Sequence, residues 1–199
     1  MSKLIFYYGT MGCSKTANAL MTRFQYQDRG KRVWLIKPAI DNRDDTVDEH
    51  GIKRTLIKSR VGISAEAQTI STDENIYNTY FLSGPVLPEV IICDEAQFLT
   101  GEQVEQLKDI SSTMNIDILC YGLRTDFRTR LFPGAARLFE LADRTVELDN
   151  VCECGQPALV NARLNAKGEV LIKGAQVEIG GDEKYKALCW SCYKRKIQR

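Results

Sequence analysis

Histidine and long apolar runs are what this 199-residue sequence has least of. His50 is the only histidine, and it lies in a charged stretch where a solvated side chain is expected. Reaction schemes in which an imidazole activates a serine or cysteine therefore have one weak candidate. The longest apolar runs, such as LIFYY and VIIC, are too short to span a bilayer, and no basic-then-apolar leader opens the chain. We expect a cytoplasmic protein with no membrane partner.

An excess of charge of one sign is also missing. The chain has 27 Lys and Arg residues against 26 Asp and Glu, for a formal net charge of +1. That balance produces no overall field that would attract nucleic acid, so no nucleic-acid partner is expected. At 44% hydrophobic and 27% charged residues, the composition is that of a globular protein with a real core. The length suits one domain with a small appendage.

The apolar pattern predicts an α/β fold. Short runs rich in β-branched and aromatic residues alternate with segments whose apolar residues follow the helical i, i+3, i+4, i+7 stripe. Buried strands that alternate with helices imply a parallel sheet covered on both faces. Residues 41–60 carry ten charged residues and no apolar periodicity, which predicts a long exposed loop. The expected strands are 3–8, 32–37, 89–95, 116–122 and 144–149, and the expected helices are 15–29, 74–82, 101–112 and 135–142.

The seven cysteines are unevenly placed, and four of them form two close pairs near the end of the chain. Since the composition also changes after Asn150, we expect one domain over 1–150 and a smaller one over 151–199. In a cytosolic protein paired cysteines indicate a metal site more than disulfides. Four thiolates suit a closed, structural Zn²⁺ site, although four free thiols or a nucleic-acid-binding zinc module remain alternatives. The predicted metal ligands are Cys152, Cys154, Cys189 and Cys192.

The stretch YGTMGCSKT at residues 8–16 almost matches the phosphate-binding pattern G-x-x-x-x-G-K-[ST]. It lies between a predicted strand and a predicted helix, which is the context that such a loop requires. Backbone N–H groups at a helix N-terminus favour phosphate, Lys15 adds a positive charge, and Thr16 offers a hydroxyl ligand for Mg²⁺. Ser14 stands where the pattern has its second glycine, so an ordinary strand-to-helix turn is the alternative.

A second candidate is VIICDE at residues 90–95, an apolar strand that ends in two carboxylates. In P-loop proteins an acid at the end of a neighbouring strand helps to hold Mg²⁺, and Asp94 suits that role. Glu95 points elsewhere and could accept a proton or orient a water molecule. Alone, the pair could also be an acidic strand end that faces solvent, but a phosphate loop upstream favours the functional interpretation.

Taken together, these motifs and several others resemble the type II (cellular, zinc-containing) thymidine kinases. The shared motifs follow the family order over nearly the whole chain. The resemblance implies a P-loop (RecA-like) parallel sheet flanked by helices, with a small C-terminal zinc-binding lasso domain. Besides the cysteines, the motifs are GTMGCSKT (9–16), KPAIDNR (37–43), SR-x-G (59–62), DEAQFL (94–99), YGLRTDFR (121–128) and IGGDEKY (179–185).

The family implies transfer of the ATP γ-phosphate to the 5′-hydroxyl of thymidine, giving dTMP in pyrimidine salvage, and leaves open whether deoxyuridine is also accepted. Glu95 would be the general base, and Mg²⁺ bound with ATP and a structural Zn²⁺ would be the cofactors. A homotetramer and feedback inhibition by dTTP are expected. The ATP site would comprise Gly9, Thr10, Met11, Gly12, Cys13, Ser14, Lys15, Thr16, Asp94, Glu95, Ala96 and Gln97.

The resemblance also distributes the remaining site residues. A lasso loop over 165–185 would close over the base. The Mg²⁺ and phosphate side would comprise Thr16, Asp41, Arg43, Arg60 and Asp94. The nucleoside side would comprise Met11, Phe98, Leu123, Phe127, Phe132, Val177, Glu178, Ile179 and Tyr185.

Two departures from the family pattern and two other functions stay open. The C-x-C pair is tighter than in many relatives, and the Cβ of Ser14 is expected to crowd the loop and weaken ATP binding. DEAQ also resembles the boxes of helicase-type motors, which would make the chain a P-loop ATPase acting on nucleic acid. A non-enzymatic zinc-ribbon module with a degenerate phosphate loop is the third possibility.

Overall fold

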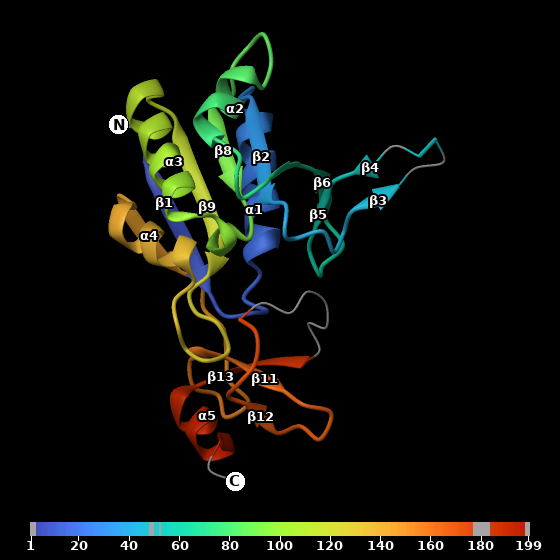
Figure 1. The fold of residues 1–199 in the computed structure, drawn as a ribbon, viewed down its shortest axis with the longest axis vertical. Helices are drawn as coiled ribbons and strands as arrows, with labels where there is room; N and C mark the ends of the chain where they lie inside the picture. Colours follow the sequence, from blue (N-terminus) through green and yellow to red (C-terminus); the bar gives the residue numbers. More distant parts are fainter. Residues whose placement is uncertain (1–2, 48–49, 52, 177–183, 198–199) are drawn as a thin grey trace.

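The computed structural model describes residues 3–47, 50–51, 53–176 and 184–197. Its main element is a sheet of six strands, all parallel, in the order β10-β1-β9-β8-β2-β7. Figure 1 shows the strands β1, β9, β8 and β2 of this sheet side by side. The strands are β1 (Leu4–Gly9), β2 (Val33–Pro38), β7 (Gln68–Ile70), β8 (Val90–Cys93), β9 (Asp117–Leu123) and β10 (Arg144–Glu147).

Both faces of the sheet are buried, as the continuous apolar runs predicted. In β9, Ile118 and Cys120 belong to the core on one face, while Leu119 and Tyr121 belong to the core on the other. Since successive side chains of a strand point to opposite faces, each central strand contributes to two hydrophobic cores. The predicted α/β fold with a parallel sheet is confirmed.

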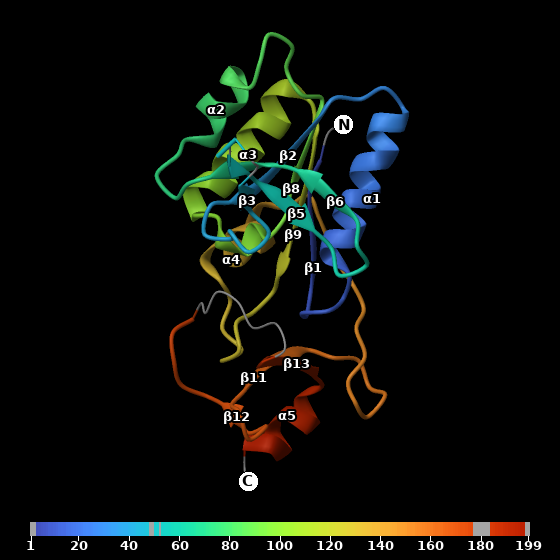
Figure 2. The same cartoon turned by 90° about the vertical axis from the view of Figure 1, so that its right-hand side faces the viewer.

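Helix α1 covers one face, and α2, α3 and α4 cover the other (Figure 2). The N-terminus of α3 has a capping box, in which Thr100 accepts from the backbone N–H of Gln103 while the Gln103 side chain accepts from the backbone of Thr100. Asn75 caps α2, and Pro133 occupies the first turn of α4, where its missing N–H costs nothing. The bounds are α1 (Lys15–Asp28), α2 (Ile76–Leu82), α3 (Gly101–Met114) and α4 (Pro133–Leu141), with a 3-10 turn η1 (Ala96–Phe98) after β8.

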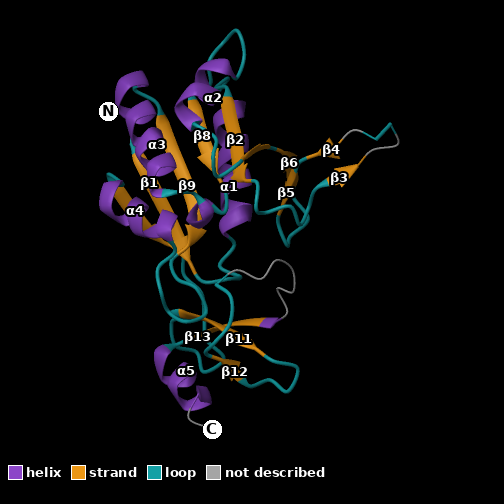
Figure 3. Cartoon of the chain, in the orientation of Figure 1, coloured by secondary structure: helices purple, strands orange, loops and turns teal. Residues whose placement is uncertain are grey.

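The prediction of one long exposed loop over 41–60 is wrong. This region contains one small antiparallel pair and the first strand of another, whose partner β6 follows it, and the next segment adds the edge strand β7 to the main sheet. Strands of two or three residues are too short to show an alternating pattern, so periodicity could not reveal them. The β3–β4 pair projects from the body in Figure 3, while Ile57 of β5 is buried against the core on the α1 side. The strands are β3 (Thr46–Val47), β4 (Lys53–Arg54), β5 (Leu56–Lys58) and β6 (Ser64–Glu66).

A separate three-stranded antiparallel sheet, β12-β11-β13, lies beyond the carboxyl ends of the parallel strands (Figure 1). Its small core includes three of the four paired cysteines. The division of the chain after residue 150 stays a prediction. In the described part of the chain, none of the helices has the length and apolar character that crossing a membrane requires. The elements are β11 (Val160–Leu164), β12 (Val170–Leu171), β13 (Tyr185–Leu188) and helix α5 (Trp190–Ile197).

Candidate active site

A cavity of about 540 Å³ opens at the carboxyl ends of the parallel strands, where α/β sheets commonly bind ligands. Its walls come from the segment after β1, the segment after β2, the β5–β6 turn, the turn after β8, the loop after β9, and the small sheet. The structure therefore brings together most of the residues that the sequence predicted. The predicted residues that line the cavity are Met11, Gly12, Ser14, Lys15, Thr16, Asp41, Arg43, Arg60, Glu95, Phe98, Leu123, Phe127, Phe132 and Tyr185.

The phosphate loop (residues 9–16) joins β1 to α1, so the free backbone N–H groups at the start of α1 face the cavity. Ser14 immediately precedes α1 and has φ 62° and ψ 27°, the left-handed conformation that favours glycine. Its side chain is exposed toward the cavity. The serine therefore bears a backbone cost, in addition to the expected crowding of the loop.

Lys15 is buried and folds back on the phosphate loop. Its Nζ donates to the carbonyl oxygen of Thr10 at 2.8 Å and lies 3.5 Å from Sγ of Cys13. The lysine cation thus lies against the phosphate loop. A lysine ammonium next to the backbone N–H groups at the start of a helix makes an anion-binding site.

Asp94 lies behind the phosphate loop and is only 4% exposed. Burial raises its pKa to about 7, and the neighbouring charge of Glu95 acts in the same direction. A hydrogen bond from Thr16 and the charge of Lys15 act against this rise. A bound cation would favour the charged carboxylate, so the chemistry of Thr16 and Asp94 suits Mg²⁺ that arrives with a nucleotide.

Glu95 is held by both of its carboxylate oxygens. Its Oε1 accepts from Arg43 at 2.7 Å, and its Oε2 accepts from Nε2 of Gln97 at 2.6 Å. The backbone of Glu95 has φ 50°, again left-handed, which ends β8 and turns the side chain into the cavity. The expected strand over 89–95 therefore stops at Cys93. Left-handed backbone at a residue other than glycine is a common mark of a functional position.

Arg43 connects Glu95 to a buried polar network. Its Nε donates to Asp41 at 2.6 Å, and Asp41 lies 3.9 Å from Nζ of the fully buried Lys37. That lysine also pairs with Asp45 at 3.0 Å and donates to a backbone carbonyl of β5. Burial acts to lower the pKa of Arg43, but the Glu95 and Asp41 carboxylates raise it overall. Arg43 therefore stays charged at the edge of the cavity.

The other end of the cavity is apolar and aromatic. Phe98 and Phe132 pack edge to face with ring centroids 5.5 Å apart. Phe127 is buried, and the guanidinium of Arg163 lies 3.5 Å from its ring centroid. Arg163 also lies 5.9 Å from the ring centroid of Tyr185, which enters the cavity from β13. Flat apolar walls with polar groups at the margin suit a planar heterocycle.

Sequence reasoning missed two asparagines and Arg163. Oδ1 of Asn161, on β11, accepts from the backbone N–H of Met11 at 2.7 Å, and its Nδ2 donates to the carbonyl of Thr125 at 2.9 Å. Asn150 donates to the carbonyl of Met11 at 2.8 Å and to Oγ1 of Thr10 at 3.0 Å. No local pattern could have revealed the contacts with the phosphate loop, because the two asparagines lie 139 and 150 residues away from Met11 in the chain.

Some predicted residues do not line the cavity. Val177, Glu178 and Ile179 lie outside the described residues. Gly9, Thr10, Cys13, Asp94, Ala96 and Gln97 stand behind the lining residues and support them.

The four paired cysteines converge, as predicted. Their Sγ atoms all lie within 4.8 Å of one another, and those of Cys154 and Cys189 are 3.6 Å apart. Ligand sulfurs around a tetrahedral Zn²⁺, with Zn–S of about 2.3 Å, are about 3.8 Å apart. The backbone N–H of Cys192 points to Sγ of Cys189, and Arg195 donates to Sγ of Cys192, which are contacts that favour thiolates. The cluster could therefore hold a metal ion, and its donor set fits zinc.

Comparison with known proteins gives consistent matches. The family model described as thymidine kinase matches residues 2–193. The thymidine kinase of Legionella pneumophila strain Paris is 41% identical over 98% of this chain and 90% of its own length. The thymidine kinase of Pasteurella multocida is 40% identical over 99% of both chains. That of Novosphingobium aromaticivorans is 40% identical over 95% of both.

Proposed function

Because this chain belongs to the thymidine kinase family and is an ATP-dependent kinase that phosphorylates thymidine in salvage, we propose that the cavity at the carboxyl ends of the parallel strands is its active site. The observation that carries the proposal is that the phosphate loop and the carboxylate of Glu95 face one cavity, with an apolar wall beyond them. ATP would bind on the side of Lys15 and thymidine on the side of Phe127 and Tyr185.

In the proposed reaction the 5′-hydroxyl oxygen of thymidine attacks the γ-phosphorus of ATP. The new O–P bond forms as the bond from the γ-phosphorus to the β,γ-bridging oxygen breaks, and ADP leaves with that electron pair. Glu95 takes the hydroxyl proton. Lys15, Arg43 and Arg60 would neutralise charge on the transferring group, and Thr16 and Asp94 would hold the Mg²⁺ that neutralises the phosphates.

Arg43 gives the reaction an order of events. It donates to Oε1 of Glu95, the carboxylate oxygen that Gln97 does not hold. When the phosphates of ATP enter, they would attract the guanidinium away, since Arg43 lies on the same cavity wall. Oε1 would then be free to receive the proton of the nucleoside hydroxyl. Substrate binding would in this way make the base available.

Recognition of the nucleoside would depend on the aromatic end of the cavity. Met11, Phe98, Leu123, Phe127 and Phe132 would contact the base and sugar. The segment 165–185 would serve as the lasso loop, whose described part carries Tyr185 into the cavity. Thymidine would be the substrate, and a panel of nucleosides would show whether deoxyuridine is also accepted.

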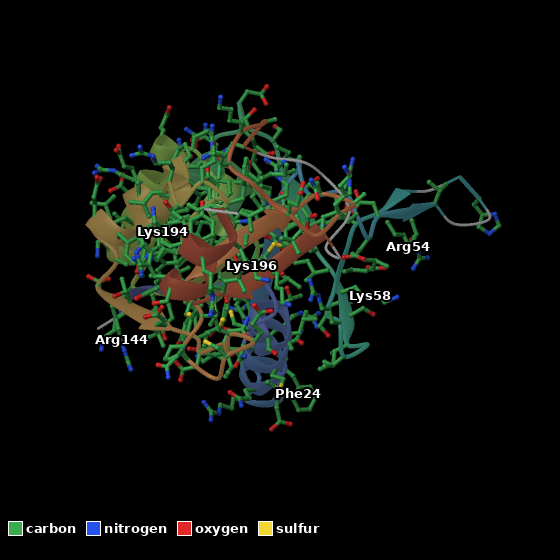
Figure 4. The ribbon with its side chains drawn as sticks, turned by 90° about the horizontal axis from the view of Figure 1, so that it is seen from below. Phe24, Arg54, Lys58, Arg144, Lys194 and Lys196 are labelled. Atoms are coloured by element: carbon green, nitrogen blue, oxygen red, sulfur yellow. The ribbon has the colours of Figure 1, made fainter. Side chains whose placement is uncertain are left out.

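The four cysteines would hold a structural Zn²⁺ that keeps the two ends of this segment together. Homotetramer formation, feedback inhibition by dTTP and a cytoplasmic location are further parts of the proposal that follow from family membership. We propose no nucleic-acid or membrane partner. Figure 4 shows the labelled residues Arg54 and Lys58 on one side of the molecule and Arg144 and Lys194 on the other.

The test is Glu95→Gln, assayed with radiolabelled thymidine, ATP and Mg²⁺. We expect kcat to fall by about 10²–10⁴-fold, because the hydroxyl loses its proton acceptor, while ATP binding is retained. Glu102→Gln, an exposed carboxylate at the start of α3, is the matched control and should keep normal turnover. Near-normal turnover of the Glu95 variant would exclude it as the base. ATP hydrolysis stimulated by nucleic acid without thymidine phosphorylation would favour the ATPase instead.

A further inference from the structure

Gln97 has an unusual environment for a residue expected to bind ATP. Its side chain is fully buried, and it is not among the residues that line the cavity. A buried amide is costly unless its donors and acceptor are satisfied. The position of Gln97 on the turn η1, two residues after Glu95, therefore needs an explanation other than ATP contact.

The hydrogen bonds of this amide fix its orientation. The backbone N–H of Leu123, at the end of β9, donates to Oε1 of Gln97 at 2.9 Å. An N–H group can only donate, so the carbonyl end of the amide must face Leu123. The NH₂ end then faces Oε2 of Glu95, at 2.6 Å. The amide thus accepts a hydrogen bond from the backbone of β9 through its oxygen and donates one to the Glu95 carboxylate through its nitrogen.

Two glycines make room for this arrangement. A Cβ on Gly122 would lie 2.8 Å from Oε1 of Gln97 and 3.0 Å from its backbone nitrogen. A Cβ on Gly134, in the first turn of α4, would lie 2.7 Å from the carbonyl oxygen of Ala96 and 2.9 Å from that of Gln97. Side chains at either position would displace η1. The turn is therefore enclosed by β9 on one side and α4 on the other.

We propose that Gln97 is a positioning residue that fixes the carboxylate of Glu95 for proton transfer. It holds Oε2, so that Oε1 is the oxygen presented to the cavity. Glu95 itself stands between β8 and η1, where no regular backbone ladder restricts its side chain. Through its two hydrogen bonds, Gln97 holds the Glu95 carboxylate in a fixed position relative to the central strand β9. This role rests on the proposed function of Glu95 as the base.

The test compares Gln97→Met with Gln103→Met. Met is close to Gln in size and shape but lacks the amide, and Gln103 is a second buried glutamine whose amide bonds only to backbone far from the cavity. We expect Gln97→Met to lower kcat by about 10- to 100-fold, because displacement of a catalytic group by about 1 Å can cost that much. KM for ATP should stay within about twofold. Gln103→Met should lower the Tm and leave kcat unchanged.

A double-variant cycle separates the two proposals. In a Glu95→Ala background there is no carboxylate to position, so adding Gln97→Met should cause no further loss of kcat. An equal further loss would overturn the positioning role, as would a raised KM for ATP with kcat intact. Normal kcat in Gln97→Met beside an inactive Glu95→Ala would overturn it too, whereas an active Glu95→Ala would instead contradict the base assignment. Gln97→Leu also lacks the amide and adds no charge beside Glu95, so it is the second variant if the Met variant is unstable.

Discussion

The two sheets of this molecule are stabilised in different ways. The parallel sheet has an apolar core on each face, built from large residues such as Phe6, Ile91 and Tyr121. The three-stranded sheet and α5 share a core in which seven of the described residues are buried, and three of these are Cys152, Cys189 and Cys192. A small sheet with so little apolar burial needs another source of stability, and its four cysteines, which could hold a metal ion, offer one. We therefore propose that the large sheet is stabilised by hydrophobic burial and the small sheet by metal ligation.

Metal removal is expected to have the largest effect, because it should unfold the small sheet and leave the large one folded. A chelator should unfold β11–β13 and α5, because metal binding to thiolates contributes about 10–16 kcal/mol in small zinc peptides. The parallel sheet should stay protected in hydrogen exchange. Elemental analysis of the untreated protein should find about one zinc per chain. Cys154→Ser should reproduce the effect, with the neighbouring Glu153→Gln as the control; a folded protein without zinc would contradict the metal site.

Tyr185→Ala tests whether the small sheet contributes to nucleoside binding. The loss of an aromatic wall should raise KM for thymidine by roughly tenfold, with a smaller change for ATP, since Tyr185 lies at the aromatic end of the cavity. Tyr185→Phe keeps the ring and separates its contribution from that of the hydroxyl. Steady-state kinetics with each substrate varied in turn gives the measurement, and equal effects on both substrates would argue against the assignment.

Asn161→Ala tests whether the small sheet also supports the phosphate loop. The variant loses a hydrogen bond to Met11 and one to Thr125, each with a net contribution of about 0.5–1.5 kcal/mol. We expect KM for ATP to rise by about fivefold. Asn165→Ala, in the β11–β12 turn, should leave it unchanged. If Asn161→Ala binds ATP normally, the small sheet does not support the phosphate loop through this residue.

Ser14→Gly should have the smallest effect. Glycine adopts the left-handed conformation without the Cβ penalty, so the free energy of unfolding should rise by up to about 1 kcal/mol and KM for ATP should fall a few-fold. Asn115→Gly is matched, because Asn115 has φ 54° at the end of α3, away from the cavity. It should change stability alone. An unchanged or higher KM in Ser14→Gly would refute the idea that this serine weakens ATP binding.

Local pattern predicted the parallel sheet well and its periphery poorly. The five long strands and four helices have enough residues to display their periodicity, whereas β7 and the β3–β6 pairs do not. The strands of the small sheet were also not predicted, because they have only two to five residues each.

The candidate site divides along the same line. Lys15, Asp94 and Glu95 stand in contiguous motifs, and the structure brings them together. The roles of Gln97, Asn161 and Arg163 depend on partners that the sequence places elsewhere: Leu123 for the first, Met11 for the second, and the ring of Phe127 for the third. A residue's role can be predicted from a motif when the motif is contiguous in the chain, but a contact with a residue far away in the chain cannot.

The folded-back position of Lys15 has a consequence for ligand discrimination. Its ammonium has three N–H donors, of which one donates to the carbonyl of Thr10 at 2.8 Å and another lies near Sγ of Cys13 at 3.5 Å. An anion can therefore be met by the ammonium while the Thr10 contact still holds the cation against the phosphate loop. A small anion such as inorganic phosphate would engage few donors here, whereas a triphosphate would reach the helix N-terminus and the arginines as well. Preference for the larger ligand would then depend on the number of donors that it reaches at the same time.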